Sequence, residues 1–172
     1  APADAGATLF TFAYDWRLSI VRAAGELAAA LEELRRARGD EVLRVDLVCQ
    51  SSGGYVCRWL AKYGGATLDE AEAGQSRSAS RLQVRRVVLV GAANGGSLRI
   101  LRELDRGRRY VGPIGRRMQP EVMFTFPAMY EDLPHQTEGL LLDGRGERIP
   151  VATAGLYDPD TWQRLGWSVF GR

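Results

Sequence analysis

Two short runs at residues 42–48 and 84–91 constrain the fold most, because both are β-branched and the second is apolar at nearly consecutive positions. Runs of this kind are typical of strands buried on both faces of a parallel sheet. A third run, TLFTFAY at residues 8–14, is β-branched and aromatic and predicts a further strand. We therefore expect an α/β fold with a mostly parallel sheet and crossover helices.

Helical patterns fill the intervals between these runs. From Ser19 to Arg38 apolar residues recur at steps of three and four, which is the stripe of an amphipathic helix. The segment YVCRWLAKYGG at residues 55–65 repeats this spacing and ends in two glycines. Residues 66–83 contain few apolar side chains and predict a surface connection with one helical turn near LDEAEA.

The second half of the sequence departs from this alternation. We expect short helices at residues 97–105 and 120–131 and a small hairpin at residues 139–152 around Asp143-Gly144, with prolines interrupting the rest. This irregular half predicts a cap over the sheet. The expected organisation is a core at residues 8–97 and a cap-like region at residues 98–172.

Composition excludes several classes of protein. The chain has 172 residues and a net charge of +2, and its arginines alternate with acidic residues, which does not indicate a nucleic-acid partner. No run of eighteen apolar residues predicts a transmembrane helix. One histidine and two cysteines make no zinc site, and we expect no metal and no cofactor. Cys49 and Cys57 are expected to be buried free thiols, which slightly favours a reducing compartment such as the cytoplasm.

The segment VCQSSGG at residues 48–54 carries the clearest signal for chemistry. A serine at the apex of a strand-to-helix turn, with small residues two positions before and after it, is a nucleophile elbow. Ser51 is the expected apex, flanked by the small residues Cys49 and Gly53 and preceded by Gln50. The backbone N–H of Ser52 is then placed at a helix N-terminus, where it can donate to a developing oxyanion.

In this elbow Gly54 further relaxes the contact between helix and strand. Three alternatives compete with this interpretation. The same segment could be a serine-glycine turn that only joins a strand to a helix. Ser52 is a poorer apex, because Gln50 would then occupy a position that needs a small side chain. The segment GAANGGS at residues 91–97 has neither the lysine of a phosphate-binding loop nor a dinucleotide glycine pattern, so nucleotide binding is disfavoured.

Several motifs occur together in a characteristic order. They are YDWRLS at 14–19, the elbow within 45–65, VRRVVLVGAANGGS at 84–97, PAMYEDLP at 127–134 and LYDPDTWQRLGW at 156–167. In this order the chain resembles the lecithin:cholesterol acyltransferase and phospholipid:diacylglycerol acyltransferase family of α/β-hydrolases and its bacterial relatives. The resemblance implies a serine nucleophile, a Ser–Asp–His triad and acyl-enzyme chemistry on a lipid ester. It also implies transfer to an acceptor alcohol or water, and transient contact with a membrane surface.

The resemblance further implies that the triad acid and histidine follow later strands, after the cap. We therefore expect this chain to be an internal fragment that lacks the later core strands and is nearly inactive alone. His135, the one histidine, is expected to be a surface-loop residue distant from Ser51. The apolar side chains between Met118 and Tyr130 are expected to form a cap core, or alternatively to line an acyl pocket. The alternative function is a non-catalytic hydrolase-fold module that binds lipid or protein.

Overall fold

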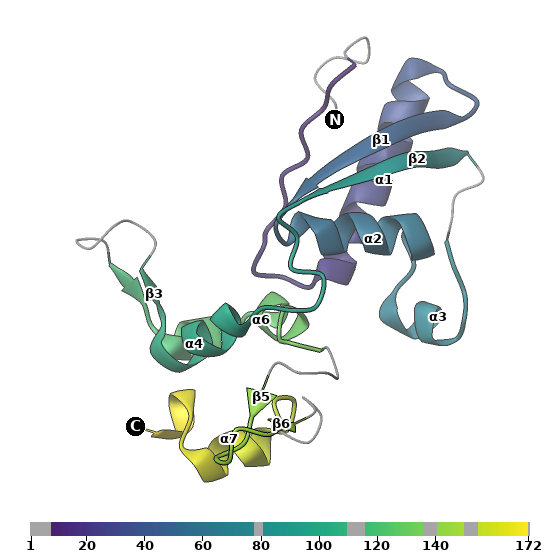
Figure 1. Ribbon diagram of the computed structural model, residues 1–172. Coiled ribbons are helices and arrows are strands. Elements are labelled where there is room, and N and C mark those ends of the chain that lie inside the picture. Colours follow the sequence, from purple (N-terminus) through teal and green to yellow (C-terminus); the bar gives the residue numbers. More distant parts are fainter. Residues whose placement is uncertain (1–7, 78–80, 110–115, 136–140, 150–154, 172) are drawn as a thin grey trace. The chain divides into compact units, whose positions relative to one another are not determined.

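The computed structural model describes residues 8–77, 81–109, 116–135, 141–149 and 155–171, and the chain divides into two compact units, Ala1–Asn94 and Gly95–Arg172 (Figure 1). Each unit has its own hydrophobic core. The division falls close to the boundary expected at residue 97. The assignment of the two parts as hydrolase core and cap stays a prediction.

The first unit is a mixed α/β structure with a parallel strand pair. Its elements are α1 (Ile20–Arg38), β1 (Leu43–Gln50), α2 (Gly53–Tyr63), α3 (Leu68–Glu72) and β2 (Leu82–Val90). β1 and β2 pair in parallel, with α2 and α3 in the connection between them. The expected α/β class with a parallel sheet and crossover helices is therefore present in this two-stranded form.

The ends of α1 follow from its sequence. The Ser19 side chain accepts a hydrogen bond from the Val21 N–H at 3.2 Å, as an N-cap should. Gly39 ends the helix in the left-handed conformation, with φ of 71°. Glu32 forms ion pairs with Arg35 and Arg36 along the exposed side of the last turns. The predicted helix at residues 19–38 is confirmed.

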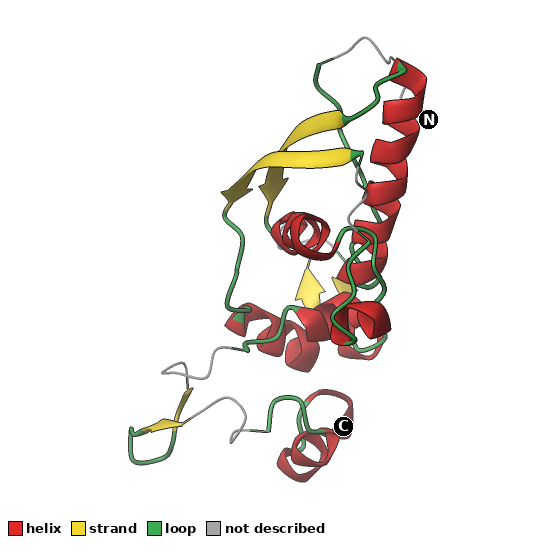
Figure 2. Cartoon of the chain, turned by 90° about the vertical axis from the view of Figure 1, so that its right-hand side faces the viewer, coloured by secondary structure: helices red, strands yellow, loops and turns green. Residues whose placement is uncertain are grey.

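Alternation along β1 decides which face of the strand pair is covered. Leu43, Leu47 and Cys49 are buried, and the last two pack into one core with the apolar sides of α1 and α2. Figure 2 shows both helices against the same face of the two strands. On the opposite face Val48 is 74% exposed and Val88 is 48% exposed. Within the described residues the sheet is thus packed on one face only.

The expected strand at residues 8–14 is wrong. These residues run as an extended segment beside β1 without joining a ladder, and the only strand partner of β1 among the described residues is β2 (Figure 1). Residues of the segment and of β1 together line a groove of about 900 Å³. The β-branched residues of this segment thus adopt an extended conformation. The segment is not a strand, because no described strand pairs with it.

The helical turn expected near LDEAEA in the connection at residues 66–83 is confirmed. The connection contains α3, which begins at a capping box in which Thr67 and Glu70 bond each other's backbone N–H groups. Glu70 also pairs with Arg77. Residues 78–80 lie outside the described part of the chain.

The second unit consists of short elements around an apolar core. These are α4 (Leu98–Arg106), β3 (Arg108–Arg109), β4 (Arg117–Met118), α5 (Pro120–Met123), α6 (Pro127–Glu131), β5 (Leu141–Leu142), β6 (Arg148–Ile149), α7 (Pro159–Leu165) and a 3₁₀ helix, Ser168–Gly171. α4 matches the helix expected at 97–105. The helix expected at 120–131 is instead two helices, because Pro127 lacks the N–H that would continue α5 and starts α6 at its first position.

The hairpin expected around Asp143-Gly144 is confirmed where the structure describes it. β5 and β6 pair antiparallel, and the Asp143 carboxylate accepts hydrogen bonds from the N–H groups of Arg145 and Glu147. The outer residues of the expected range, 139–140 and 150–152, lie outside the described residues. No helix in the described part of the chain has the length and apolar character needed to cross a membrane.

Gly54 sets the closest approach of α2 to the sheet end. A Cβ at this position would lie 2.5 Å from the Ala92 Cβ, just beyond β2. The relaxation of helix-to-strand contact expected for Gly54 is therefore confirmed. Gly25, in the middle of α1, has nothing within 4 Å of its Cβ position.

These two glycines give a matched pair of substitutions. Gly54→Ala should lower the free energy of unfolding by about 1–3 kcal/mol, because the added methyl overpacks against Ala92. Gly25→Ala should leave it unchanged or raise it by up to about 1 kcal/mol, because the methyl enters open space in a helix. Chemical denaturation of both variants beside the parent measures the contrast. Equal effects would show that α2 does not approach the sheet as closely as described.

Candidate functional site

Ser51 lies in the turn between β1 and α2, at the carboxyl end of the strand. Its φ of 51° is one of two positive values among the non-glycine residues that the structure describes. The Ser51 N–H donates to the Val90 carbonyl at 3.0 Å, which ties the turn to the end of β2. The residue is exposed. The sequence prediction of an unusual backbone conformation at a tight strand-to-helix turn is confirmed.

Ser52 begins the helix that follows. It is the N-cap of α2, with φ of −59° and ψ of −21°, and α2 has 11 residues. The N–H groups at the start of a helix have no acceptor within the helix and carry its positive dipole end. The backbone N–H of Ser52 is therefore of the kind that can donate to negative charge developing beside Ser51.

The side chain of Ser52 contacts Tyr14, which the sequence analysis did not select as a site residue. The two hydroxyl oxygens lie 3.2 Å apart, and Ser52 makes no side-chain cap bond to α2. The Tyr14 hydroxyl is also 3.8 Å from the Cβ position of Gly53. Tyr14 therefore joins the extended segment to the elbow. Its signal in the sequence was its place as the first residue of the YDWR motif.

The other residues of that motif have a local role. The Arg17 guanidinium donates to the Asp15 carboxylate from Nε at 2.7 Å. This side-chain hydrogen bond is the main cause that lowers the pKa of Asp15 to about 2. Trp16 between them is 39% exposed. The pair fixes the bend that leads from the extended segment into α1.

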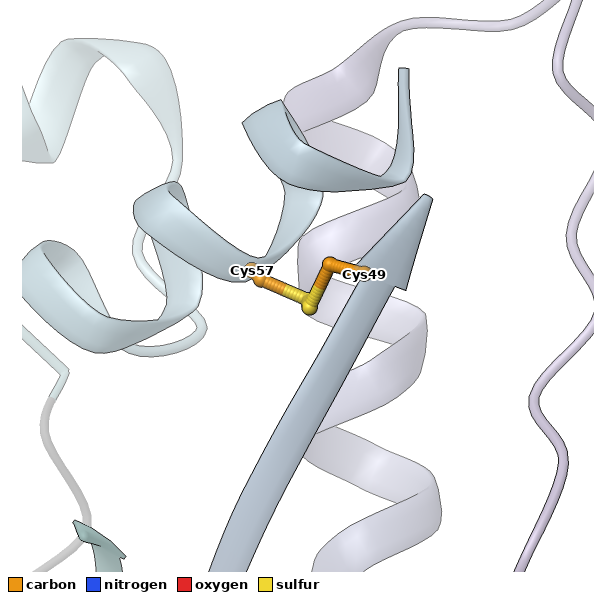
Figure 3. The surroundings of a disulfide bond; sticks show 2 residues. All are labelled: Cys49 and Cys57. Carbon is orange, nitrogen blue, oxygen red and sulfur yellow. A yellow bond between two sulfur atoms is a disulfide. The ribbon is translucent and has the colours of Figure 1, made fainter. Parts of the chain in front are cut away.

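A disulfide joins the two sides of the elbow, and the expectation of two free thiols is wrong. Cys49, at the end of β1, is bonded to Cys57, in the second turn of α2, across a Cα–Cα distance of 6.5 Å (Figure 3). Both residues are nearly fully buried in the core shared by α1, α2 and the strands. The bridge therefore encloses Ser51 and Ser52 in a short covalent loop.

The physical reason for this correction is the reversal at the elbow. Eight residues separate the two cysteines in sequence, but the turn at Ser51 folds α2 back against β1. The number of cysteines in a sequence carries no information about this local geometry. The bridge also removes the observation that favoured a reducing compartment, since disulfides persist where the environment is oxidising.

The remaining predicted support residues differ in how tightly they are held. Gln50 is exposed at the last position of β1. A Cβ at Gly53 would make only an ordinary van der Waals contact, so Gly54 rather than Gly53 is the sterically required glycine. Cys49 is small, as the elbow needs, and is fixed by its bridge.

The first unit contains no histidine that could act as the base for Ser51. His135 belongs to the second unit, where its backbone N–H donates to the Gly95 carbonyl at 3.3 Å, and the expected distance of His135 from Ser51 stays a prediction. The acid of a triad has no counterpart assigned in the described chain. No group of three or more metal-ligating side chains occurs in the described ranges.

The apolar side chains between Met118 and Tyr130 form the core of the second unit. Met123, Phe126 and Met129 are buried in it, together with Trp162 from α7. Phe124 contacts the rings of both Tyr130 and Trp162 edge to face. The expectation that these residues form a core is confirmed, and the assignment of that core to a cap stays a prediction.

Removal of the bridge should weaken the first unit. Cys49→Ala/Cys57→Ala should lower the free energy of unfolding by about 2–3 kcal/mol, because the unfolded chain regains the entropy of the open loop. Unfolding of the parent chain with and without a dithiol reductant is the matched control, since it leaves the side chains in place. Alkylation of two thiols in the unreduced native chain would contradict the bridge.

Comparison with family models, with curated proteins and with solved structures finds no match. The resemblance to the acyltransferase family therefore depends on the sequence motifs alone. The function of this site is accordingly argued below from its geometry and chemistry.

Proposed function

We propose that the chain carries the nucleophile of a serine acyltransferase or lipase of the α/β-hydrolase type that acts on lipid esters. The observation that supports this most is the exposed Ser51, a non-glycine residue with φ of 51° between a parallel strand and a helix N-terminus. A turn that only connects two elements gains nothing from such strain, which costs about 1–3 kcal/mol. Strain of this kind at an exposed hydroxyl favours a catalytic role.

In the proposed reaction the Ser51 Oγ attacks the ester carbonyl carbon and its proton passes to a base. The C–O bond to the alcohol then breaks, and the alcohol leaves with a proton returned by the base. The acyl-enzyme at Ser51 is resolved by an acceptor alcohol or by water. Throughout, the Ser52 N–H donates to the oxygen that becomes negatively charged.

The base of this mechanism is not assigned to a residue of the first unit, which contains no histidine. The one histidine in the sequence, His135, belongs to the second unit. The family resemblance implies a histidine and an acid on later strands. The proposal therefore assigns steps to two residues of this chain, Ser51 as the nucleophile and Ser52 as the backbone donor.

Labelling with a fluorophosphonate tests the nucleophile separately from turnover. Long incubation of the folded chain with imidazole as an external base should place the adduct on Ser51, because its hydroxyl is exposed at a helix N-terminus, and Ser51→Ala should abolish it. Ser52→Ala is the matched control and should retain labelling, because the donor at that position is a backbone N–H. A native chain labelled no more than the urea-unfolded chain would favour the non-catalytic binding module.

Ester hydrolysis by the 172-residue chain should be close to background. Loss of the histidine from a serine triad costs on the order of a millionfold in turnover, because the hydroxyl proton has no acceptor. Release of p-nitrophenol from a short-chain ester, with Ser51→Ala beside the parent, measures this. Robust turnover that disappears in Ser51→Ala would show that a base exists within these residues.

A further inference from the structure

A groove in the second unit is lined almost entirely by arginine. It has a volume of about 420 Å³, and six of the eight described residues that line it are Arg99, Arg102, Arg106, Arg108, Arg109 and Arg117. The other two are Glu103 and Gly107. The volume is that of a site for one small group rather than for an extended polymer. The net charge of the whole chain is only +2, so this concentration of cations is local.

α4 supplies three of these arginines from one side of the helix. Arg99, Arg102 and Arg106 are spaced three and four residues apart, which places neighbouring guanidinium groups on the same face. Like charges at this spacing destabilise a helix. The spacing of these arginines therefore places positive charge along the groove, and the repulsion between them destabilises α4 locally.

The β3–β4 pair adds a second unfavourable arrangement. Arg109 and Arg117 are directly opposite each other across the antiparallel ladder. Like charges in this position are also destabilising. Gly107 makes the arrangement possible, because its φ is 70° and a Cβ there would lie 2.2 Å from the Met118 carbonyl oxygen. A glycine is thus required where α4 turns into the strand that carries Arg108 and Arg109.

Two carboxylates form ion pairs with arginines of this groove. Glu103 is the only carboxylate among the described lining residues, and its Oε1 lies 2.6 Å from Arg99 Nε and 3.5 Å from Arg108 Nε. Asp105, outside that lining, places its Oδ2 3.3 Å from Arg106 Nε. Glu103 is 5% exposed, so it acts as a buried support that holds two of the guanidinium groups. Two carboxylates against six guanidinium groups leave the described lining of the groove with a net positive charge, which suits an anion.

We propose that this groove binds the phosphate group of an anionic lipid headgroup. Arginine suits phosphate because its planar guanidinium donates two parallel hydrogen bonds to one oxyanion group. A bound phosphate would relieve the repulsion both along α4 and across the ladder. The choice of a lipid over a soluble phosphate ester rests on the proposed function. It is supported by Leu98, which is 45% exposed on α4 beside Arg99 and offers an apolar contact next to the cations.

Vesicle binding by the full chain tests the proposal. The vesicles are phosphatidylcholine with phosphatidic acid, and the charge control is phosphatidylcholine with an equal charge of oleate. The groove variant is Arg102→Gln/Arg117→Gln, and the matched control is Arg145→Gln/Arg164→Gln, which removes the same charge from exposed residues of the same unit outside the groove lining. Thermal unfolding of each variant checks that both remain folded.

We expect binding to the phosphatidic acid vesicles to weaken about thirtyfold in the groove variant and by less than about threefold in the control. Binding to the oleate vesicles should be weaker than to phosphatidic acid. Equal losses in both double variants, or equal binding to both vesicles, would overturn the proposal in favour of diffuse surface charge.

Two further binding measurements distinguish the molecules that could supply the phosphate group. Inorganic phosphate that stabilises the parent but not the groove variant, with no vesicle binding, would assign the site to a soluble phosphate ester and overturn the lipid. A single-stranded oligonucleotide that binds more tightly than the vesicles, and loses binding in the groove variant, would assign it to nucleic acid. Ser51→Ala should bind vesicles as the parent does, so failure of the proposed reaction leaves this result unaffected.

Discussion

The strained backbone at Ser51 is the constraint on which the first unit depends. A positive φ at a non-glycine residue persists only where the surroundings hold it, and here three contacts do so. The Ser51 N–H bonds the end of β2, the Cys49–Cys57 bridge ties α2 to β1, and Gly54 lets α2 approach Ala92. All three contacts act on the short loop that contains Ser51. The packed core of the first unit therefore fixes the backbone that carries the exposed hydroxyl.

The disulfide changes how this site should be understood. Its sulfur atoms lie within the packed core, where they replace two thiols by a covalent link between strand and helix. The energetic benefit of so short a loop is moderate, but its position is informative, because the loop contains both Ser51 and Ser52. A bridge at this place restricts the geometry of the proposed nucleophile and of the proposed oxyanion donor together.

Sequence patterns predicted the regular elements well and the irregular contacts poorly. The apolar stripe and capping residues of α1 are local signals, and so are the short β-branched runs of β1 and β2. The segment at residues 8–14 failed as a strand because a strand also needs a partner, which local composition cannot supply. The alternation of arginine with acidic residues along the chain did not indicate a cationic groove, because sequence spacing alone does not reveal that β3 and β4 bring Arg109 and Arg117 to the same groove.

The sequence by itself determined the α/β class of the first unit, the limits of its main helix and the position of Ser51 at a strand-to-helix turn. Periodicity and turn residues encode these features, because they depend on interactions between residues a few positions apart. Only the tertiary structure decided that Cys49 meets Cys57, that Tyr14 reaches Ser52 and that six arginines line one groove. Those contacts depend on the direction in which the chain leaves each turn, and that direction is set by packing between elements rather than by the residues within any one of them.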